Sequence, residues 1–165
     1  PNALAFVRWE AALRNLPALQ LAADHDLQPI YDTVGGNPLA LRLVVGLTHT
    51  HALDTVLADL TAARGTTIEN LYLFIYRRAW EQLDDATRAA FLAMPLVSAR
   101  GGTIDFLADV SDLDVSAVRA ALERLVALNL VDSRGDLHTR RYTIHNLTRT
   151  FLQEQVARWL LPAQV

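Results

Sequence analysis

The apolar positions in the first part of the chain repeat with a helical spacing. One face, with apolar residues at i, i+3, i+4 and i+7, is formed by Leu53, Val56, Leu57 and Leu60. The predicted helices cover about 4–13, 27–34, 39–47 and 53–60. The 39–47 segment is apolar nearly all round, so we expect it at the centre of a bundle. Residues 1–66 are therefore predicted to form a four-helix bundle.

The second part combines helical spacing with one short segment of strand spacing. Its predicted helices cover about 68–83, 84–95, 104–110, 114–129 and 147–161. Before the last of them, alternating apolar and polar residues flank the Gly135-Asp136 turn, which is typical of a β-hairpin. Residues 67–165 are thus predicted to form a winged helix-turn-helix with a two-stranded β wing, joined by a hinge at 64–67. The predicted fold is mainly α.

Side chains that can accept a hydrogen bond from a helix N-terminus stand where several predicted helices begin. The expected caps are Asp26, Asn37, Thr103, Asp114 and Asn146. Thr66 and Glu69 have the spacing of a capping box, which predicts the start of the 68–83 helix.

The composition excludes several classes of function. All fifteen basic residues are arginine, so the chain has neither the lysine of a phosphate-binding P-loop nor a Schiff-base lysine. Cysteine is absent, which excludes disulfides and thiolate zinc sites and favours a cytoplasmic location. No apolar run is long enough to span a membrane, and we predict no metal site. A net charge of −3 does not favour general binding of polyanions.

Two short motifs stand at predicted helix starts. In Gly35-Gly36-Asn37-Pro38-Leu39-Ala40-Leu41, two glycines end one helix, and an asparagine and a proline begin the next. In Ile144-His145-Asn146-Leu147, a histidine stands where the hairpin leads into the last helix. Helix N-termini present free N–H groups, so an anion would be stabilised beside either motif. Each motif also has a purely structural interpretation. The first can be an ordinary joint between two helices, and the second a partly buried histidine at the end of a strand.

Both motifs also stand in a particular order along the chain. Between them lies a third segment, Ile75-Tyr76-Arg77-Arg78-Ala79-Trp80-Glu81-Gln82-Leu83. This order resembles the C-terminal half of NB-ARC nucleotide switches, which belong to the STAND class of signalling ATPases, of the bacterial regulator type. Gly36-Asn37-Pro38-Leu39 stands where the family has Gly-Leu-Pro-Leu, and Ile144-His145-Asn146 where it has Met-His-Asp. The resemblance covers nearly the whole chain.

The resemblance implies a regulatory segment that closes over bound ADP and holds an inactive state. The nucleotide-binding residues that it implies are Gly36, Asn37, Pro38, Leu39, His145 and Asn146. Pro38 would pack near the adenine and ribose, and His145 would contact the β-phosphate. Ile144 in place of methionine conserves volume, whereas Asn146 in place of aspartate keeps a polar oxygen and removes a charge.

The resemblance also implies that the chain is a segment of a longer protein, in line with its start at Pro1 rather than at methionine. A nucleotide-binding core would precede it, hold the phosphates of ADP or ATP with Mg²⁺, and be the partner of these two modules. The parent would be a STAND-class NTPase that oligomerises when active. This chain alone is predicted to have no enzymatic activity and to hold no nucleotide tightly.

DNA binding is the alternative function, because the second helix of a helix-turn-helix pair enters the major groove. In the predicted helix over 114–129, Arg119 and Arg124 are balanced by Asp114 and Glu123. The stretch 132–149 has a surplus of two arginines over acidic residues, which is small for duplex DNA. The sequence therefore favours the nucleotide switch over a DNA-binding transcriptional regulator.

Overall fold

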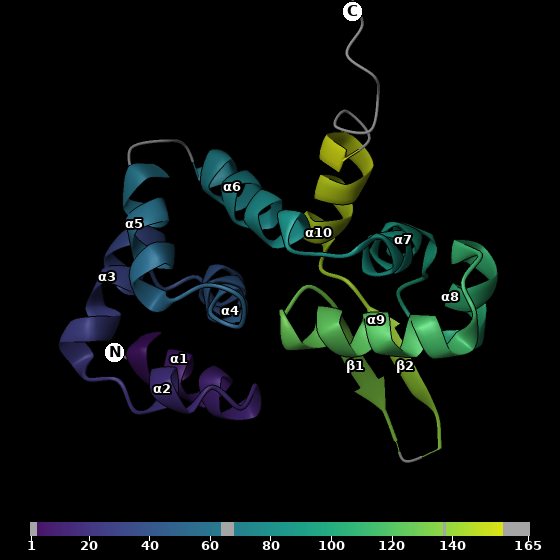
Figure 1. Ribbon diagram of the computed structural model, residues 1–165, viewed down its shortest axis with the longest axis horizontal. Helices are drawn as coiled ribbons and strands as arrows, with labels where there is room; N and C mark the ends of the chain where they lie inside the picture. The colour runs from purple at the N-terminus through teal and green to yellow at the C-terminus, as the bar shows by residue number, and fades with distance from the viewer. Residues whose placement is uncertain (1–2, 64–67, 137, 157–165) are drawn as a thin grey trace, which may run out of the picture. The chain divides into compact units, whose positions relative to one another are not determined.

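The computed structural model describes residues 3–63, 68–136 and 138–156, and it is mainly helical with one small antiparallel sheet (Figure 1). The prediction of a mainly α fold is confirmed. These residues fall into two compact units, one reaching to Gln82 and including Ala127–Asn129, the other containing the rest. Within the ranges just given, no helix combines the length and the apolar character needed to cross a bilayer.

The first unit is built around one buried helix. Its helices are α1 (Ala3–Leu13), α2 (Pro17–Gln20), α3 (Asp24–Val34), α4 (Pro38–Leu47), α5 (Leu53–Ala63) and α6 (Ile68–Glu81). Seven of the ten residues of α4 are buried, and this helix packs against α1, α3 and α6 (Figure 1). The predicted central position of the 39–47 segment follows from its all-round apolar surface. The short helix α2 was not predicted.

Close backbone packing explains the glycine inside α4. A β-carbon on Gly46 would lie 2.1 Å from the carbonyl oxygen of Leu128, which belongs to the same unit. No rotamer change relieves such an overlap, because the backbone fixes the position of a β-carbon and the carbonyl is main chain. Gly46 therefore lets the Ala127–Asn129 segment approach α4 more closely than any other residue would allow.

A polar cluster lies within the same unit. The Glu10 side chain of α1 is buried, with its carboxylate 3.3 Å from Nε of Arg42 and 3.8 Å from Nε of Arg14. Asn129 joins this cluster by donating from Nδ2 to the Arg42 carbonyl at 2.9 Å and to Glu10 at 3.4 Å. The buried charge of Glu10 is thus compensated by two guanidinium groups and one amide.

The second unit contains helices and the hairpin. Its elements are α7 (Asp85–Ala93), the 3₁₀-helix η1 (Met94–Leu96), α8 (Ile104–Ser111), α9 (Val115–Ala127, of which Ala127 is grouped with the first unit), β1 (Asp132–Gly135), β2 (Arg140–Thr143), α10 (Asn146–Thr150) and the π-helix η2 (Phe151–Val156). The predicted hairpin is confirmed, with Asp132 opposite Thr143 and Arg134 opposite Arg141. An isolated antiparallel bridge also joins Gly102 to Tyr142.

Several predicted helix caps are present in the structure. Asn37, Thr103 and Asp114 each accept a hydrogen bond from a main-chain N–H in the first turn of their helix. The predicted cap at Asp26 is wrong, because α3 begins at Asp24 and has no side-chain cap. The capping box at Thr66 and Glu69 involves residues outside the described positions.

The first compact unit extends to Gln82, because α6 packs against α4 and α5. The domain division predicted between residues 66 and 67 stays a prediction. The hinge predicted at 64–67 lies outside the described residues. The single closing helix predicted from residue 147 is instead α10 followed by the π-helix η2.

Asp84 caps α7 and gives the fold a pH-dependent contribution. Its carboxylate accepts a hydrogen bond from the N–H of Thr87 at 2.7 Å. Hydrogen bonds from the side chain and main chain of Thr87 hold the pKa of Asp84 below its ordinary value. A lowered pKa means that the ionised group stabilises the folded chain above the ordinary carboxyl pKa. That stabilisation is lost as the pH falls through the lowered value.

Asp84→Ala is expected to lower the free energy of unfolding by about 1 kcal/mol at pH 7, since it removes the cap. Urea denaturation at a series of pH values measures this, and the difference from wild type should shrink as the pH falls through the lowered pKa. Asp84→Asn is the control: it keeps a capping oxygen and should lose less stability. A loss that grows as the pH falls would contradict the role assigned to the carboxylate.

Candidate functional site

The first motif forms an exposed loop between α3 and α4. Gly35 ends α3 with a φ of 71°, a left-handed conformation that favours glycine, and donates its N–H to the Tyr31 carbonyl at 2.7 Å. Gly36 has no positive φ, and a β-carbon there would make only an ordinary contact with the Tyr31 ring. The backbone freedom expected of both glycines is needed only at Gly35.

Asn37 occupies the N–H groups that this helix start offers. Its Oδ1 accepts from the N–H of Leu39 at 3.0 Å and from that of Ala40 at 3.3 Å, and Pro38 has no N–H. The expectation that these N–H groups are free for an anion is therefore wrong for this loop. Gly36, Asn37 and Pro38 are exposed and Leu39 is half-buried, so the loop offers a ligand an apolar ring and main-chain surface rather than donors.

The second motif places a histidine at the start of α10. The helix begins at Asn146, and His145 rather than Asn146 is its cap, with Nδ1 accepting from the N–H of Leu147 at 3.1 Å. The predicted cap at Asn146 is thus wrong by one residue, because an unprotonated imidazole nitrogen can replace a side-chain oxygen. With Nδ1 as acceptor, the proton of the neutral ring is on Nε2. His145 is exposed, so this Nε2–H can donate to a ligand.

A cavity of about 520 Å³ lies beside His145 within the second unit. Its lining residues are Val97, Ser98, Ala99, Asp132, Arg134, Thr143, Ile144, His145, Asn146 and Arg149. Arg134 and Arg149 outnumber the one acidic residue, Asp132, which leaves a net positive charge around the cavity. Arg149 donates to the carbonyls of Val97, at 3.1 Å, and of Pro95. These bonds hold its guanidinium in place, so the cavity has the donors and the charge that an anion needs.

The predicted site residues are divided between the two units. Gly36, Asn37, Pro38 and Leu39 belong to the first unit, and the structure brings them together in one loop. His145 and Asn146 belong to the second unit and line one cavity. Arg134 and Arg149 were not predicted as site residues. The signal for Arg149 was its position four residues after His145, which places both on one helix face.

A metal site does not emerge from the described part of the chain, where no three histidine, aspartate or glutamate side chains are grouped to hold an ion. No family model matches the sequence, and no curated protein matches it.

Proposed function

We propose that this chain is the regulatory segment of an ATP/ADP-dependent signalling switch of the NB-ARC type. In this proposal the first unit is the helical bundle and the second a winged helix. Both act on a nucleotide whose phosphates and Mg²⁺ are held by a core domain of the same parent protein. The two units would favour ADP by contacting it only in the closed, inactive arrangement, because a ligand shifts an equilibrium only by differential affinity.

One observation carries the proposal: the cavity beside His145 combines the Nε2–H donor of the imidazole with two arginines. A phosphate group is the ligand that this combination of donors and charge fits best. The exposed Pro38 loop supports the proposal from the other unit, since an apolar ring without free N–H groups suits a base or ribose better than a phosphate.

The winged-helix part of the proposal has its own support. Helices α7, α8 and α9 precede the hairpin. Gly102, which lies in the chain between α7 and α8, forms a bridge with Tyr142 and so adds a third short segment to the sheet. The proposed relation to NB-ARC proteins can be tested directly in the gene of the parent protein. A Gly-x-x-x-x-Gly-Lys run is expected within the domain of about 150–200 residues that precedes Pro1. A parent without such a run would overturn the proposal.

His145→Asn is the variant that tests the ligand role of the histidine. Asparagine keeps a capping acceptor for α10 and removes the Nε2–H donor. A hydrogen bond to a charged phosphate contributes about 1.5–3 kcal/mol, so ADP affinity in the parent protein should fall roughly tenfold to hundredfold. Isothermal titration calorimetry measures the affinity, and size-exclusion chromatography should show a shift towards the oligomeric state.

The control for this variant is His138→Asn, which changes an exposed histidine beside the hairpin turn, outside the cavity lining. ADP affinity should be unchanged there, and thermal unfolding should show that both variants keep their fold. If His145→Asn binds ADP as tightly as wild type, the histidine is a helix cap and no more.

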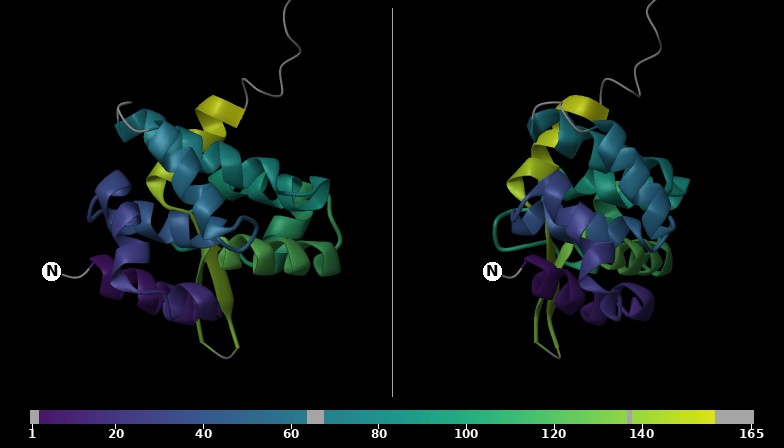
Figure 2. Two further views of the ribbon diagram at one scale, coloured as in Figure 1. Left: turned by 60° about the vertical axis from the view of Figure 1, so that its left-hand side comes forward. Right: turned by 90° about the vertical axis from the view of Figure 1, so that its left-hand side faces the viewer.

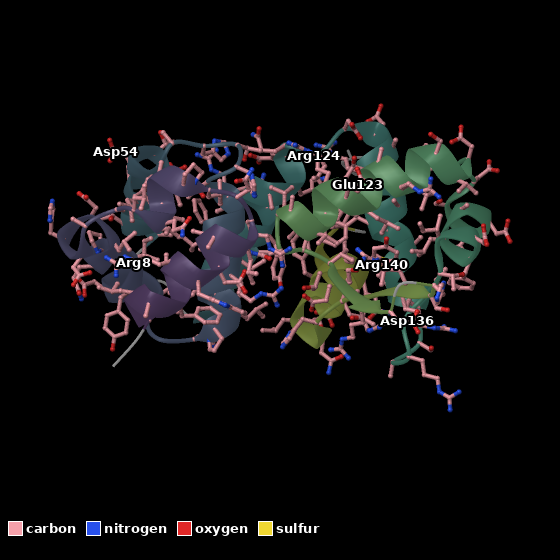
Figure 3. The ribbon with its side chains drawn as sticks, turned by 90° about the horizontal axis from the view of Figure 1, so that it is seen from below. Arg8, Asp54, Glu123, Arg124, Asp136 and Arg140 are labelled. Atoms are coloured by element: carbon pink, nitrogen blue, oxygen red, sulfur yellow. The ribbon has the colours of Figure 1, made fainter. Side chains whose placement is uncertain are left out.

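DNA binding remains the second candidate, and the charges of α9 oppose it. Glu123 and Arg124 are neighbours on this helix (Figure 3). Arg119 is exposed on the same helix, and the exposed Asp114 comes just before it. The charge of Arg124 also helps to lower the pKa of Asp84, although the hydrogen bonds from Thr87 have the larger effect.

We expect no sequence-specific duplex binding by this chain, and non-specific binding that disappears by about 0.15 M salt. Fluorescence anisotropy with a random duplex library, read at low salt and at that concentration, measures both. Sub-micromolar, sequence-selective binding at the higher salt would favour the DNA-binding alternative. Arg119→Ala and Arg140→Ala would then distinguish base contacts from phosphate contacts.

A further inference from the structure

An apolar surface on α8 and the start of α9 is open to solvent. Phe106 and Val110 lie one helical turn apart on α8 and Val115 begins α9, and these side chains are 41%, 37% and 41% exposed. We call this surface the α8 face. Phe106 and Val110 are four residues apart and therefore neighbours on one side of α8, so at least these two exposed side chains share a surface.

The rim of the α8 face has a single sign of charge. We take as its rim the four exposed aspartates that flank these side chains in the sequence, Asp105, Asp109, Asp112 and Asp114. No arginine occurs between residues 101 and 118, and within the described residues none of the four is in an ion pair. An apolar centre with an acidic rim is complementary to a basic surface with aliphatic side-chain stems, and arginine provides both.

The β1–β2 hairpin of the same unit has the complementary charge. Arg134, Arg140 and Arg141 are exposed, and Arg134 stands directly opposite Arg141 in the strand register. Like charges in that position weaken strand pairing unless an opposite charge meets them. The acidic residue of the turn, Asp136, already accepts hydrogen bonds from the N–H groups of His138 and Thr139, both at 2.8 Å.

The hairpin is also placed to reach another molecule. Figures 1 and 2 show that it extends beyond the helices of its own unit, and Figure 3 labels Arg140 and Asp136 on it. We propose that the hairpin of one molecule docks on the α8 face of a second copy. This contact joins two different surfaces, so it leaves one free surface of each kind at the ends and can repeat from copy to copy. The proposed contact between copies does not depend on nucleotide binding.

Sedimentation velocity over a concentration series tests the proposal with the chain itself. At low salt the average mass should rise above the monomer mass of 18.3 kDa as concentration increases. The same series at about 0.5 M salt should show markedly less association, because exposed charges are screened over a few ångströms there.

Two charge-reversed variants make the test specific. Asp105→Arg/Asp109→Arg leaves two arginines beside Asp112 and Asp114 and so removes the net negative charge of the rim. Arg134→Glu/Arg140→Glu leaves two glutamates beside Arg141 and so reverses the net charge of the three hairpin positions. Each variant alone should stay monomeric, with its dissociation constant raised at least about tenfold, because the charge attraction between the two surfaces is lost. An equimolar mixture should associate again, since the unaltered hairpin of the first variant can dock on the unaltered α8 face of the second.

Asp54→Arg is the matched control, because it reverses an exposed acidic residue of α5 in the other unit (Figure 3). It should associate like wild type. Circular dichroism checks the fold of each variant, and Asp105→Asn/Asp109→Asn gives a milder change in the same direction if the arginine version unfolds.

Three results would overturn the proposal. One is a wild-type chain that stays monomeric at every concentration in low salt, which would leave the α8 face to a different partner. The second is self-association that persists in both reversed variants. The third is a mixture of the two that remains monomeric, since a contact made by these two surfaces must recover when an unaltered copy of each is present.

Discussion

Gly46→Ala is expected to lower the free energy of unfolding by about 3 kcal/mol, at the upper end for overpacking by one methyl group. The added carbon would lie 2.1 Å from the Leu128 carbonyl oxygen, so two main-chain segments must separate. Alanine is the better helix former, and at an exposed helical glycine the same change would stabilise the fold. A loss of stability on Gly46→Ala, rather than a gain, would therefore show that the backbone packing around Gly46 is close.

Gly36→Ala provides the comparison, because a β-carbon there would be 3.7 Å from Cε2 of Tyr31, an ordinary contact. Its free energy of unfolding should stay within about 0.5 kcal/mol of wild type. Urea denaturation of both variants measures the difference. A Gly46→Ala protein as stable as wild type would show that the Ala127–Asn129 segment does not pack against α4 in solution.

Glu10→Ala should also cost about 3 kcal/mol, because it removes the acidic partner of two guanidinium groups. Arg42 and Arg14 would lose their counter-charge, and the Asn129 amide would lose one acceptor. The Glu10 side chain is only 4% exposed, so little of its interaction is screened by water. Thermal and urea unfolding of the variant measure the loss.

The exposed pair Arg8–Asp24 is the control for this prediction. The Asp24 side chain is 77% exposed, and Asp24→Asn should change the free energy of unfolding by less than about 1 kcal/mol. Equal losses for Glu10→Ala and Asp24→Asn would mean that burial adds nothing to the cluster, contrary to the role assigned to Glu10.

Local sequence signals predicted the parts of the fold that depend on neighbouring residues. Asn37, Thr103 and Asp114 cap their helices as expected, because a cap involves only the next three residues. The buried position of α4 followed from its all-round apolar surface. The Gly135-Asp136 signal marked the end of the first strand, where Gly135 pairs with Arg140 and the turn begins at Asp136.

Features that depend on distant residues were not predictable in this way. The cavity beside His145 brings Val97 and Arg134 next to α10, and no local pattern records that proximity. The grouping of α6 with the first unit depends on its packing against α4 and α5 rather than on the composition at residues 64–67. The cap at His145 was missed because aspartate, asparagine, serine and threonine are the expected caps.

Asn129 combines two demands that few residues can meet together. It has a φ of 59°, and its buried amide donates to Glu10 and to the Arg42 carbonyl. Glycine would meet the first demand and lose the amide, whereas aspartate would bring a second negative charge towards Glu10. Very few substitutions should therefore be accepted at this position during evolution. An asparagine kept here across divergent sequences would mark architecture, and a search for functional residues by invariance alone would mistake it for part of a binding site.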